Sequence, residues 1–288
     1  MSDRGILSSL RYLFADFIGE DDDTPPFLPE GLPEAVAPVA GDAIHMLIDY
    51  QGTSYAQLYV DRLRRFVGRH DVDDTMLTEI ARLMAARMSY EDPIRIAQLT
   101  LATLGDQPVK PVDVVRKFRL DELIGALPAI VAEPVLDGLD WLGWARMPFP
   151  IRFSTASRLG IRRLKIEAGL KRWRLLSVRY AKERVWVERW LHMIDRSLTK
   201  QPGATPAIIQ TATMVSGYGD GYRQGLADWS AIIDGLVKPT FDGVLALPDL
   251  AGAVAEARAV ALPDPRQAAL KRTIAEIRAR APVSSNAA

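Results

Sequence analysis

The chain has 288 residues and a mass of 31.9 kDa, and its 48 % hydrophobic and 25 % charged residues are typical of a globular protein with a substantial core. Its 36 basic residues balance 36 acidic ones, so no whole-chain charge exists to attract nucleic acid or a membrane surface. The absence of cysteine excludes disulfides, thiol nucleophiles and cysteine-ligated iron–sulfur or zinc centres, and the three histidines stand far apart.

Residues 1–41 are predicted to form an N-terminal amphipathic helix followed by an acidic, proline-rich strap. Ile6, Leu10, Leu13 and Phe17 form an apolar stripe, and five prolines follow between positions 25 and 38. Residues 1–42 hold nine acidic residues against two basic ones. Neither a signal-peptide cleavage pattern nor a run of apolar residues long enough for a membrane span is present, so a cytoplasmic location is expected.

Residues 42–282 are predicted to be helical almost throughout, which gives an all-α, irregular multi-helix bundle. Apolar residues recur at spacings of three and four on both sides of Gly52, and Asp92 before Pro93 has the pattern of a helix N-cap. Further helices are expected over 75–88, 93–104, 155–174, 177–198, 205–215 and 226–237, with two shorter ones near the C-terminus. Two short helices within 120–144 are expected to break at Pro128 or Pro134, and residues 147–150 read as a connector. A sub-boundary is therefore placed near 145–155, and residues 283–288 are expected to be a disordered tail.

Residues 152–196 carry thirteen basic residues against four acidic ones, the largest local charge imbalance in the chain. One interpretation is structural: these side chains form solvated faces, pair with Glu167, Glu183 and Glu188, or meet the acidic strap or a partner protein. Another is a surface for a nucleotide or coenzyme A, with nucleic acid less favoured. The basic residues considered are Arg158, Arg162, Arg163, Lys165, Lys171, Arg172, Arg174 and Arg179, with Trp173, Trp186 and Trp190 available for stacking.

No pattern in the sequence assembles a catalytic set or a metal site. If the chain binds a ligand, we expect a site formed by Tyr180, Glu183, Gly217, Gly219, Asp220 and Arg223, because the glycine-rich turn 217–225 precedes a helix start where backbone N–H groups can hold an anion. A tight connection between helices is the alternative explanation of this turn. Glu91, Asp92 and Arg95 form a second polar cluster, best explained by helix capping and a short-range ion pair. No catalytic residue and no metal ligand is predicted.

Four segments together resemble the C-terminal helical domain, a domain of unknown function, of the indolepyruvate oxidoreductase beta-subunit family. They are IDYQGTSYAQLYVDRL (48–63), MSYEDPIRIAQL (88–99), LKRWRLLSVRYAKERVWVERWL (170–191) and GYGDGYRQGLADW (217–229). They occur in the family's order across most of the chain, although each is weak alone.

This resemblance implies a connection to the thiamine diphosphate-dependent oxidation of 2-oxo acids to acyl-coenzyme A, carbon dioxide and reduced ferredoxin. In that family an alpha subunit carries the thiamine site and the iron–sulfur clusters, and the beta subunit begins with an α/β domain of the gamma type. No glycine-rich strand–helix unit precedes Asp42 here, so we expect the helical domain to stand alone as a split subunit.

The leading hypothesis is a non-catalytic accessory subunit or domain of an indolepyruvate-type 2-oxoacid:ferredoxin oxidoreductase. It would bind no cofactor itself, and its partners would be the catalytic alpha and gamma-type subunits rather than nucleic acid or a membrane. Thiamine diphosphate, iron–sulfur clusters and coenzyme A would belong to those partners. The alternative is a stand-alone helical protein that binds a phosphorylated or coenzyme A-linked small molecule.

Overall fold

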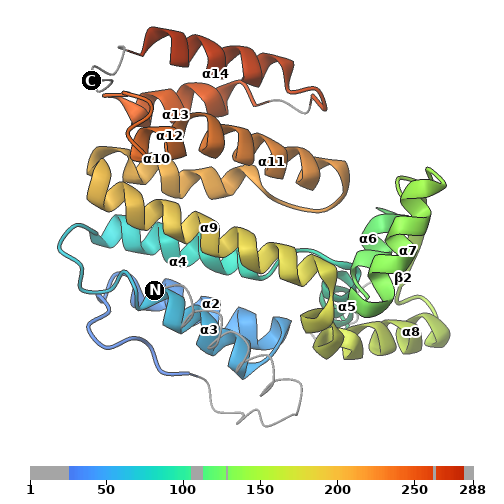
Figure 1. Cartoon of the computed structure of the whole chain (residues 1–288). Helices are drawn as coiled ribbons and strands as arrows, with labels where there is room; N and C mark the ends of the chain where they lie inside the picture. The colour runs from blue at the N-terminus through green and yellow to red at the C-terminus, as the bar shows by residue number, and fades with distance from the viewer. Residues whose placement is uncertain (1–25, 105–112, 128, 262–263, 282–288) are drawn as a thin grey trace. The chain divides into compact units, whose positions relative to one another are not determined.

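The computed structural model describes residues 26–104, 113–127, 129–261 and 264–281 (Figure 1). The chain divides into two compact units that interleave in sequence. Unit 1 comprises Met1–Leu28, Gly41–Arg62 and Met88–Val185, and unit 2 comprises Pro29–Ala40, Leu63–Arg87 and Trp186–Ala288. The predicted N-terminal helix and the C-terminal tail lie outside the described residues. The described part confirms the predicted all-α, multi-helix class, with one two-stranded sheet.

Unit 1 contains the helices whose caps the sequence indicates most clearly. It includes α2 (Ala37–Tyr50) from Gly41 onward, α3 (Thr53–Leu63) up to Arg62, and α5 (Pro93–Ala102). Asp92 caps α5 by accepting a 2.6 Å hydrogen bond from the backbone N–H of Arg95, and Pro93 occupies the first turn, where its missing N–H has no helical partner to lose. Pro38 lies in the first turn of α2 for the same reason, so α2 begins inside the proline-rich segment.

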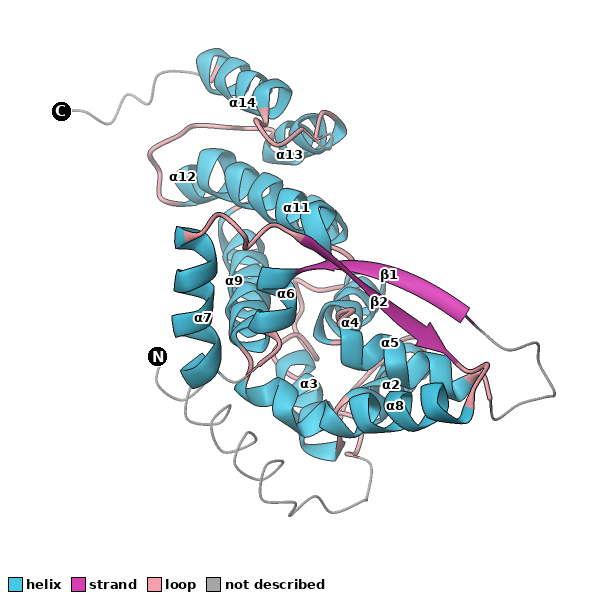
Figure 2. Ribbon diagram, turned by 90° about the vertical axis from the view of Figure 1, so that its right-hand side faces the viewer, coloured by secondary structure: helices cyan, strands magenta, loops and turns pink. Residues whose placement is uncertain are grey.

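A β-hairpin in unit 1 corrects two expectations from the sequence. β1 (Asp113–Arg119) pairs antiparallel with β2 (Pro148–Ser154), drawn as the magenta arrows in Figure 2. The predicted connector at 147–150 therefore begins a strand, and both prolines of that stretch lie within it. Phe118 and Phe153, buried with ring centroids 6.3 Å apart, supply the apolar contact that the short, weakly alternating strands do not reveal in sequence.

Three further helices complete unit 1 around this hairpin (Figure 1). They are α6 (Leu120–Gly125), α7 (Ala129–Trp141) and α8 (Arg158–Gly169). The predicted break falls between α6 and α7, near residue 128, because α7 accommodates Pro134 internally. The long helix expected over 155–174 is shorter: α8 starts at its Ser157 cap and gives way to a 3₁₀ segment, η1 (Leu170–Leu176), before α9 (Val178–Lys200) begins.

Unit 2 is helical, and its core contains three buried tryptophans. It contains α4 (Asp74–Met88) up to Arg87, most of α9, α10 (Thr205–Gln210), α11 (Gly219–Ile232), α12 (Lys238–Phe241), α13 (Leu250–Ala259) and α14 (Ala268–Arg280). Short 3₁₀ segments flank α10, namely η2 (Pro202–Ala204) and η3 (Thr211–Met214), and a π-helical turn, η4 (Ile233–Val237), joins α11 to α12. Trp186 stacks parallel to Trp190 and tilts against Trp229, whose indole N–H donates to Thr211.

The helix predicted over 226–237 begins seven residues earlier, because the predicted glycine-rich turn is largely helical. Within residues 217–225, only Gly217 and Gly219 have positive φ values, 69° and 73°, which non-glycine residues rarely adopt. From Gly219 onward the chain is α11, and Tyr222, Gly225 and Trp229 are buried along one face at spacings of three and four. Gly225 is required by packing, since a Cβ there would overlap the carbonyl oxygen of Met214.

Candidate functional site

The first three of the four family-like segments meet inside unit 1 around one buried guanidinium, that of Arg174. Arg174 is 1 % exposed, and its Nε and Nη2 donate to the two carboxylate oxygens of Asp92 at 2.6 and 3.0 Å. Its Nη1 donates to the backbone carbonyl of Tyr50 at 2.7 Å, and its Cζ lies 3.9 Å from the centre of the Tyr50 ring. Planar bidentate pairing and stacking on an aromatic ring are interactions that arginine makes better than lysine.

Local sequence features position both partners of this ion pair. Asp92 is fixed as the N-cap of α5, so one carboxylate oxygen serves the helix and the guanidinium together. Arg174 lies within η1, and Ser177 follows η1 and precedes α9. The Ser177 hydroxyl links the two elements, because it donates to the Arg174 carbonyl at 2.7 Å and accepts from the Tyr180 N–H at 3.1 Å. The α5 cap and the start of α9 are therefore tied to the same buried charge.

Buried tyrosines surround the ion pair. The Tyr50 ring lies 6.0 Å from Tyr55 and 5.8 Å from Tyr90, and Tyr55 lies 5.9 Å from Tyr180, measured between ring centroids. The Tyr55 hydroxyl donates to the Met88 carbonyl at 2.9 Å. The hydroxyls of Tyr50 and Tyr90 are buried with no hydrogen-bond partner among the described residues.

The surroundings of three phenols and of the Arg174 guanidinium in this cluster keep those groups in one protonation state near neutral pH. Burial raises the pKa of the Tyr50, Tyr55 and Tyr90 phenols well above the ordinary value, so they stay protonated. Burial by itself lowers the pKa of Arg174, but Tyr50 and Asp92 outweigh it and raise that pKa overall, so the guanidinium stays charged. The arrangement suits a permanent structural ion pair better than acid–base catalysis.

The structure brings several sequence-predicted site residues to this region. Asp92 is central to it, and the Arg95 guanidinium lies 5.6 Å from the Tyr50 ring centre. Glu183 is buried and pairs with Arg179 at 3.0 Å, one helical turn away. Tyr180 is buried against Tyr55, whereas Glu91 is exposed. The carboxylate of Asp92 thus pairs with the distant Arg174 rather than with its neighbour Arg95.

The remaining predicted residues belong to unit 2. Gly217 precedes α11, Gly219 and Asp220 lie in its first turn, and Arg223 lies one turn further along. Asp220 and Arg223 are exposed. An acidic residue in the first turn of a helix is favourable because it faces the partial positive charge of the backbone N–H groups.

The sequence does not reveal which basic residue of 152–196 is buried. The sequence predicts a solvated or phosphate-facing side chain for Arg174, and the structure corrects this prediction because Arg174 is buried. The signal that could have found it is its context, since Trp173 precedes it and Leu175 and Leu176 follow it. Several other basic residues of this stretch form structural pairs, including Arg163 with Glu167 at 2.6 Å and Arg196 with Asp242 at 2.8 Å.

A second feature of unit 1 is the number of large apolar side chains that it exposes. Trp141 is 87 % exposed and Ile130 86 %, both on α7. We call the exposed large hydrophobic residues between β1 and the end of η1 the exposed apolar set: Val115, Leu127, Ile130, Val131, Val135, Trp141, Leu142, Trp144, Met147, Phe149, Leu159, Ile166, Leu170, Trp173 and Leu176. These residues make up most of the exposed large hydrophobic side chains among the described residues.

Exposed cations of α8 and η1 stand near members of this set in the sequence. Arg158, Arg162, Lys165 and Arg172 are exposed and have no carboxylate partner among the described residues. In sequence they alternate with Leu159, Ile166 and Trp173. A surface of this kind favours a partner that presents apolar side chains together with acidic ones.

Within the described ranges, no group of three or more potential metal-ligating side chains occurs. None of the described helices combines the length and the apolar character needed to cross a membrane.

Comparison with known proteins identifies a family. Residues 36–235 match a family of unknown function, DUF6537, and because the match spans more than half of the chain, the protein belongs to that family. The match includes all four of the segments quoted above and the exposed apolar set. No curated protein and no solved structure matches the chain.

Proposed function

We propose that this chain is a non-catalytic accessory subunit or domain of an indolepyruvate-type, thiamine diphosphate-dependent 2-oxoacid:ferredoxin oxidoreductase. In this proposal the exposed apolar set of unit 1 docks onto the catalytic subunits. The observation that carries the proposal is the distribution of exposed apolar residues. Among the described residues, Val244 is the one exposed large hydrophobic side chain of unit 2, whereas unit 1 has many.

Two features support docking: the residue types of the exposed apolar set and the exposed cations of α8. Tryptophan, methionine and arginine are enriched in protein interfaces, and Trp141, Trp144, Met147 and Trp173 are all at least half exposed. The exposed cations of α8 would fix the orientation of an acidic partner surface more than they would raise its affinity. The partner face is therefore expected to be apolar at its centre and acidic at its edge.

The buried cluster around Arg174 supports a role without chemistry of its own. Burial raises the pKa of Tyr50 and Tyr90, and the pKa of Arg174 is raised overall, so these three groups keep one protonation state across the physiological range. The hydrogen bonds of Arg174 and Ser177 hold α5, η1 and α9 in place. In the proposed complex the partner subunits would supply thiamine diphosphate, iron–sulfur clusters and coenzyme A. The link to this enzyme class rests on the resemblance of the four segments.

The test is an affinity purification of the tagged full chain from its native cell under anaerobic conditions, read by mass spectrometry and iron content. We expect recovery of an iron–sulfur, thiamine-dependent oxidoreductase, and loss of that recovery in Trp141→Glu. Val244→Glu is the matched control, because it places the same charge at an exposed apolar position of unit 2. Val244→Glu should retain the partner.

Two results would contradict the proposal. One is recovery of the chain alone, colourless and free of iron. The other is a partner that Trp141→Glu and Val244→Glu retain equally, since docking would then not involve α7.

The second candidate function is a stand-alone protein that binds a phosphorylated or coenzyme A-linked molecule. The exposed cations Arg158, Arg162, Lys165 and Arg172, which have no carboxylate partner within the described ranges, favour it. A saturable thermal shift with coenzyme A, abolished in Arg158→Gln/Arg162→Gln, would support it, and no shift at millimolar coenzyme A would exclude it.

A further inference from the structure

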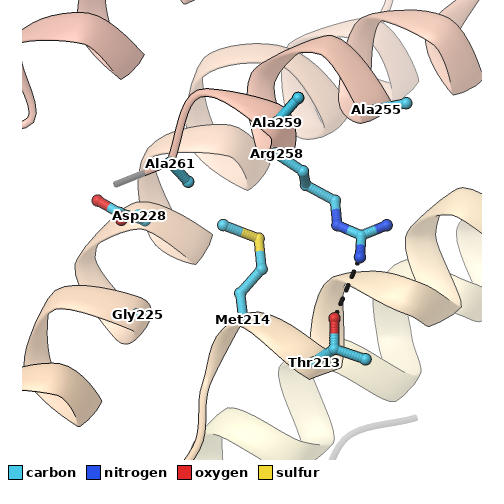
Figure 3. Close-up of a pocket in the computed structure, with 8 residues that line it drawn as sticks. All are labelled: Thr213, Met214, Gly225, Asp228, Ala255, Arg258, Ala259 and Ala261. Carbon is cyan, nitrogen blue, oxygen red and sulfur yellow. Dashed lines mark hydrogen bonds between the residues drawn. The ribbon is translucent and has the colours of Figure 1, made fainter. Parts of the chain in front are cut away.

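A pocket of about 440 Å³ lies within unit 2, between η3, α11 and α13 (Figure 3). Small side chains leave most of its space open. It is lined by Thr213, Met214, Gly225, Asp228, Ala255, Arg258, Ala259 and Ala261. The volume falls in the range of small-molecule sites, about 300–1,000 Å³.

Arg258 forms one wall of the pocket and has no carboxylate partner among the described residues. The Arg258 guanidinium donates one hydrogen bond, from Nη2 to the Thr213 hydroxyl at 3.1 Å, and its Nε is buried without a partner among the described residues. No carboxylate of the described chain lies within ion-pair distance of it, and burial lowers its pKa. A partly desolvated guanidinium of this kind favours an incoming anion, and a planar carboxylate fits its donors best.

Asp228 forms another wall of the pocket, and its carboxylate likewise has no cationic partner among the described residues. Asp228 is buried, and its Oδ1 accepts hydrogen bonds from the side-chain amides of Gln224 at 2.7 Å and Gln267 at 2.8 Å. Both donors are neutral, and no cation of the described chain lies within ion-pair distance of this carboxylate. Asp228 and Arg258 therefore carry opposite charges in one pocket without pairing with each other.

The side chain of Met214 lies between these two walls in Figure 3. Methionine is flexible and readily changes rotamer, so it can yield to a ligand that reaches both charges.

We propose that this pocket binds a small zwitterion, an amino carboxylic acid, with its carboxylate on Arg258 and its ammonium group on Asp228. The site is independent of the docking function proposed above. A molecule with only one of the two charges would leave the other wall unpaired and would bind more weakly.

The full chain carrying [methyl-¹³C]methionine provides the test, with the Met214 signal assigned by Met214→Leu. Glycine, β-alanine, 4-aminobutyrate and 6-aminohexanoate are titrated as a series in which only the separation of the charges changes. Acetate and methylammonium serve as single-charge probes. We expect a saturable shift of the Met214 methyl signal with one chain length of the series, at a concentration at least tenfold below that of either single-charge probe.

Arg258→Gln and Asp228→Asn are each expected to raise the half-saturating concentration at least tenfold. Arg272→Gln is the matched control, because it removes the charge of an exposed arginine of the same unit, and it should bind like the wild type. The proposal is overturned if no amino acid of the series gives a saturable shift, if acetate binds as tightly, or if Arg258→Gln binds unchanged.

Discussion

The six tryptophans divide evenly between the two units and occupy opposite environments. Trp141, Trp144 and Trp173 of unit 1 are at least 51 % exposed, whereas Trp186, Trp190 and Trp229 of unit 2 are at most 4 % exposed. Both units consist mainly of amphipathic helices, so helix formation does not explain the contrast. Among the described residues, unit 2 exposes one large hydrophobic side chain, Val244, whereas unit 1 exposes many. Our docking proposal assigns the exposed apolar residues of unit 1 to a partner surface.

The buried charge of Arg174 is expected to stabilise unit 1, and its removal tests this contribution. Arg174→Met leaves the Asp92 carboxylate buried beside an apolar side chain, and we expect it to lower the free energy of unfolding by about 3–5 kcal/mol. Chemical denaturation monitored by circular dichroism measures the loss.

Two variants sharpen this prediction. Arg174→Met/Asp92→Asn should recover part of the stability, because the buried charge is gone and an asparagine still caps α5. Arg163→Ala, which breaks the exposed pair with Glu167, should cost less than about 1 kcal/mol. Equal losses for Arg174→Met and Arg163→Ala would show that the buried pair has no special role.

Close packing in unit 2 is tested by two glycines of α11. Gly225→Ala forces a methyl group onto the Met214 carbonyl, and we expect it to cost about 1–3 kcal/mol. Gly221→Ala, in the same helix but with open space around its Cα, should instead stabilise the chain by about 0.5–1 kcal/mol. Thermal unfolding of the two variants should shift in opposite directions, and a shift in the same direction would contradict the packing described for this face.

The tyrosine cluster of unit 1 predicts a smaller and more selective effect. Tyr55→Phe removes a buried hydrogen bond to Met88 and should cost about 1 kcal/mol. Tyr50→Phe and Tyr90→Phe remove hydroxyls that have no hydrogen-bond partner in the part of the chain that the structure describes, so each should be neutral or slightly stabilising. Denaturation midpoints that fall equally in all three variants would contradict this distinction.

The same tyrosines predict how stability depends on alkaline pH. Burial raises the pKa of Tyr50, Tyr55 and Tyr90, so the folded chain keeps these protons at pH values where the unfolded chain, with tyrosine pKa values near 10, has lost them. Stability from this source is complete below pH 10 and declines as the pH rises above it. Unfolding free energies measured between pH 8 and about pH 11 should show the decline, and Tyr50→Phe should reduce its slope. An unchanged slope would mean that Tyr50 does not contribute.

The sequence predicts the positions of the helices far better than it predicts the contacts between elements that are distant in sequence. The Asp92–Pro93 cap and the periodic runs before residue 104 place α2 to α5 closely, because those signals are local. The hairpin of β1 and β2 is missed because its stability comes from the pairing of strands far apart in sequence. The burial of Arg174 is missed for the same reason: Asp92, its partner, lies 82 positions away.

The same contrast between local signals and distant contacts holds for the candidate site. Asp92, Tyr180 and Glu183 could be chosen from sequence as polar or aromatic groups near helix starts, and they do lie in or beside the buried cluster. The exposed apolar set could not be recognised, because residues such as Ile130 and Ile166 have the helical spacing of a buried face. Periodicity indicates which residues share a face of a helix, but it does not say whether the same chain covers that face.

The most direct test of the docking account is hydroxyl-radical footprinting of the six tryptophans in the free chain and in the complex recovered with the catalytic subunits. The account predicts that Trp141, Trp144 and Trp173 are oxidised in the free chain and protected in the complex, while Trp186, Trp190 and Trp229 stay unoxidised in both. If the tryptophans of unit 1 are oxidised equally with and without the partner subunits, the exposed apolar set is not the docking surface.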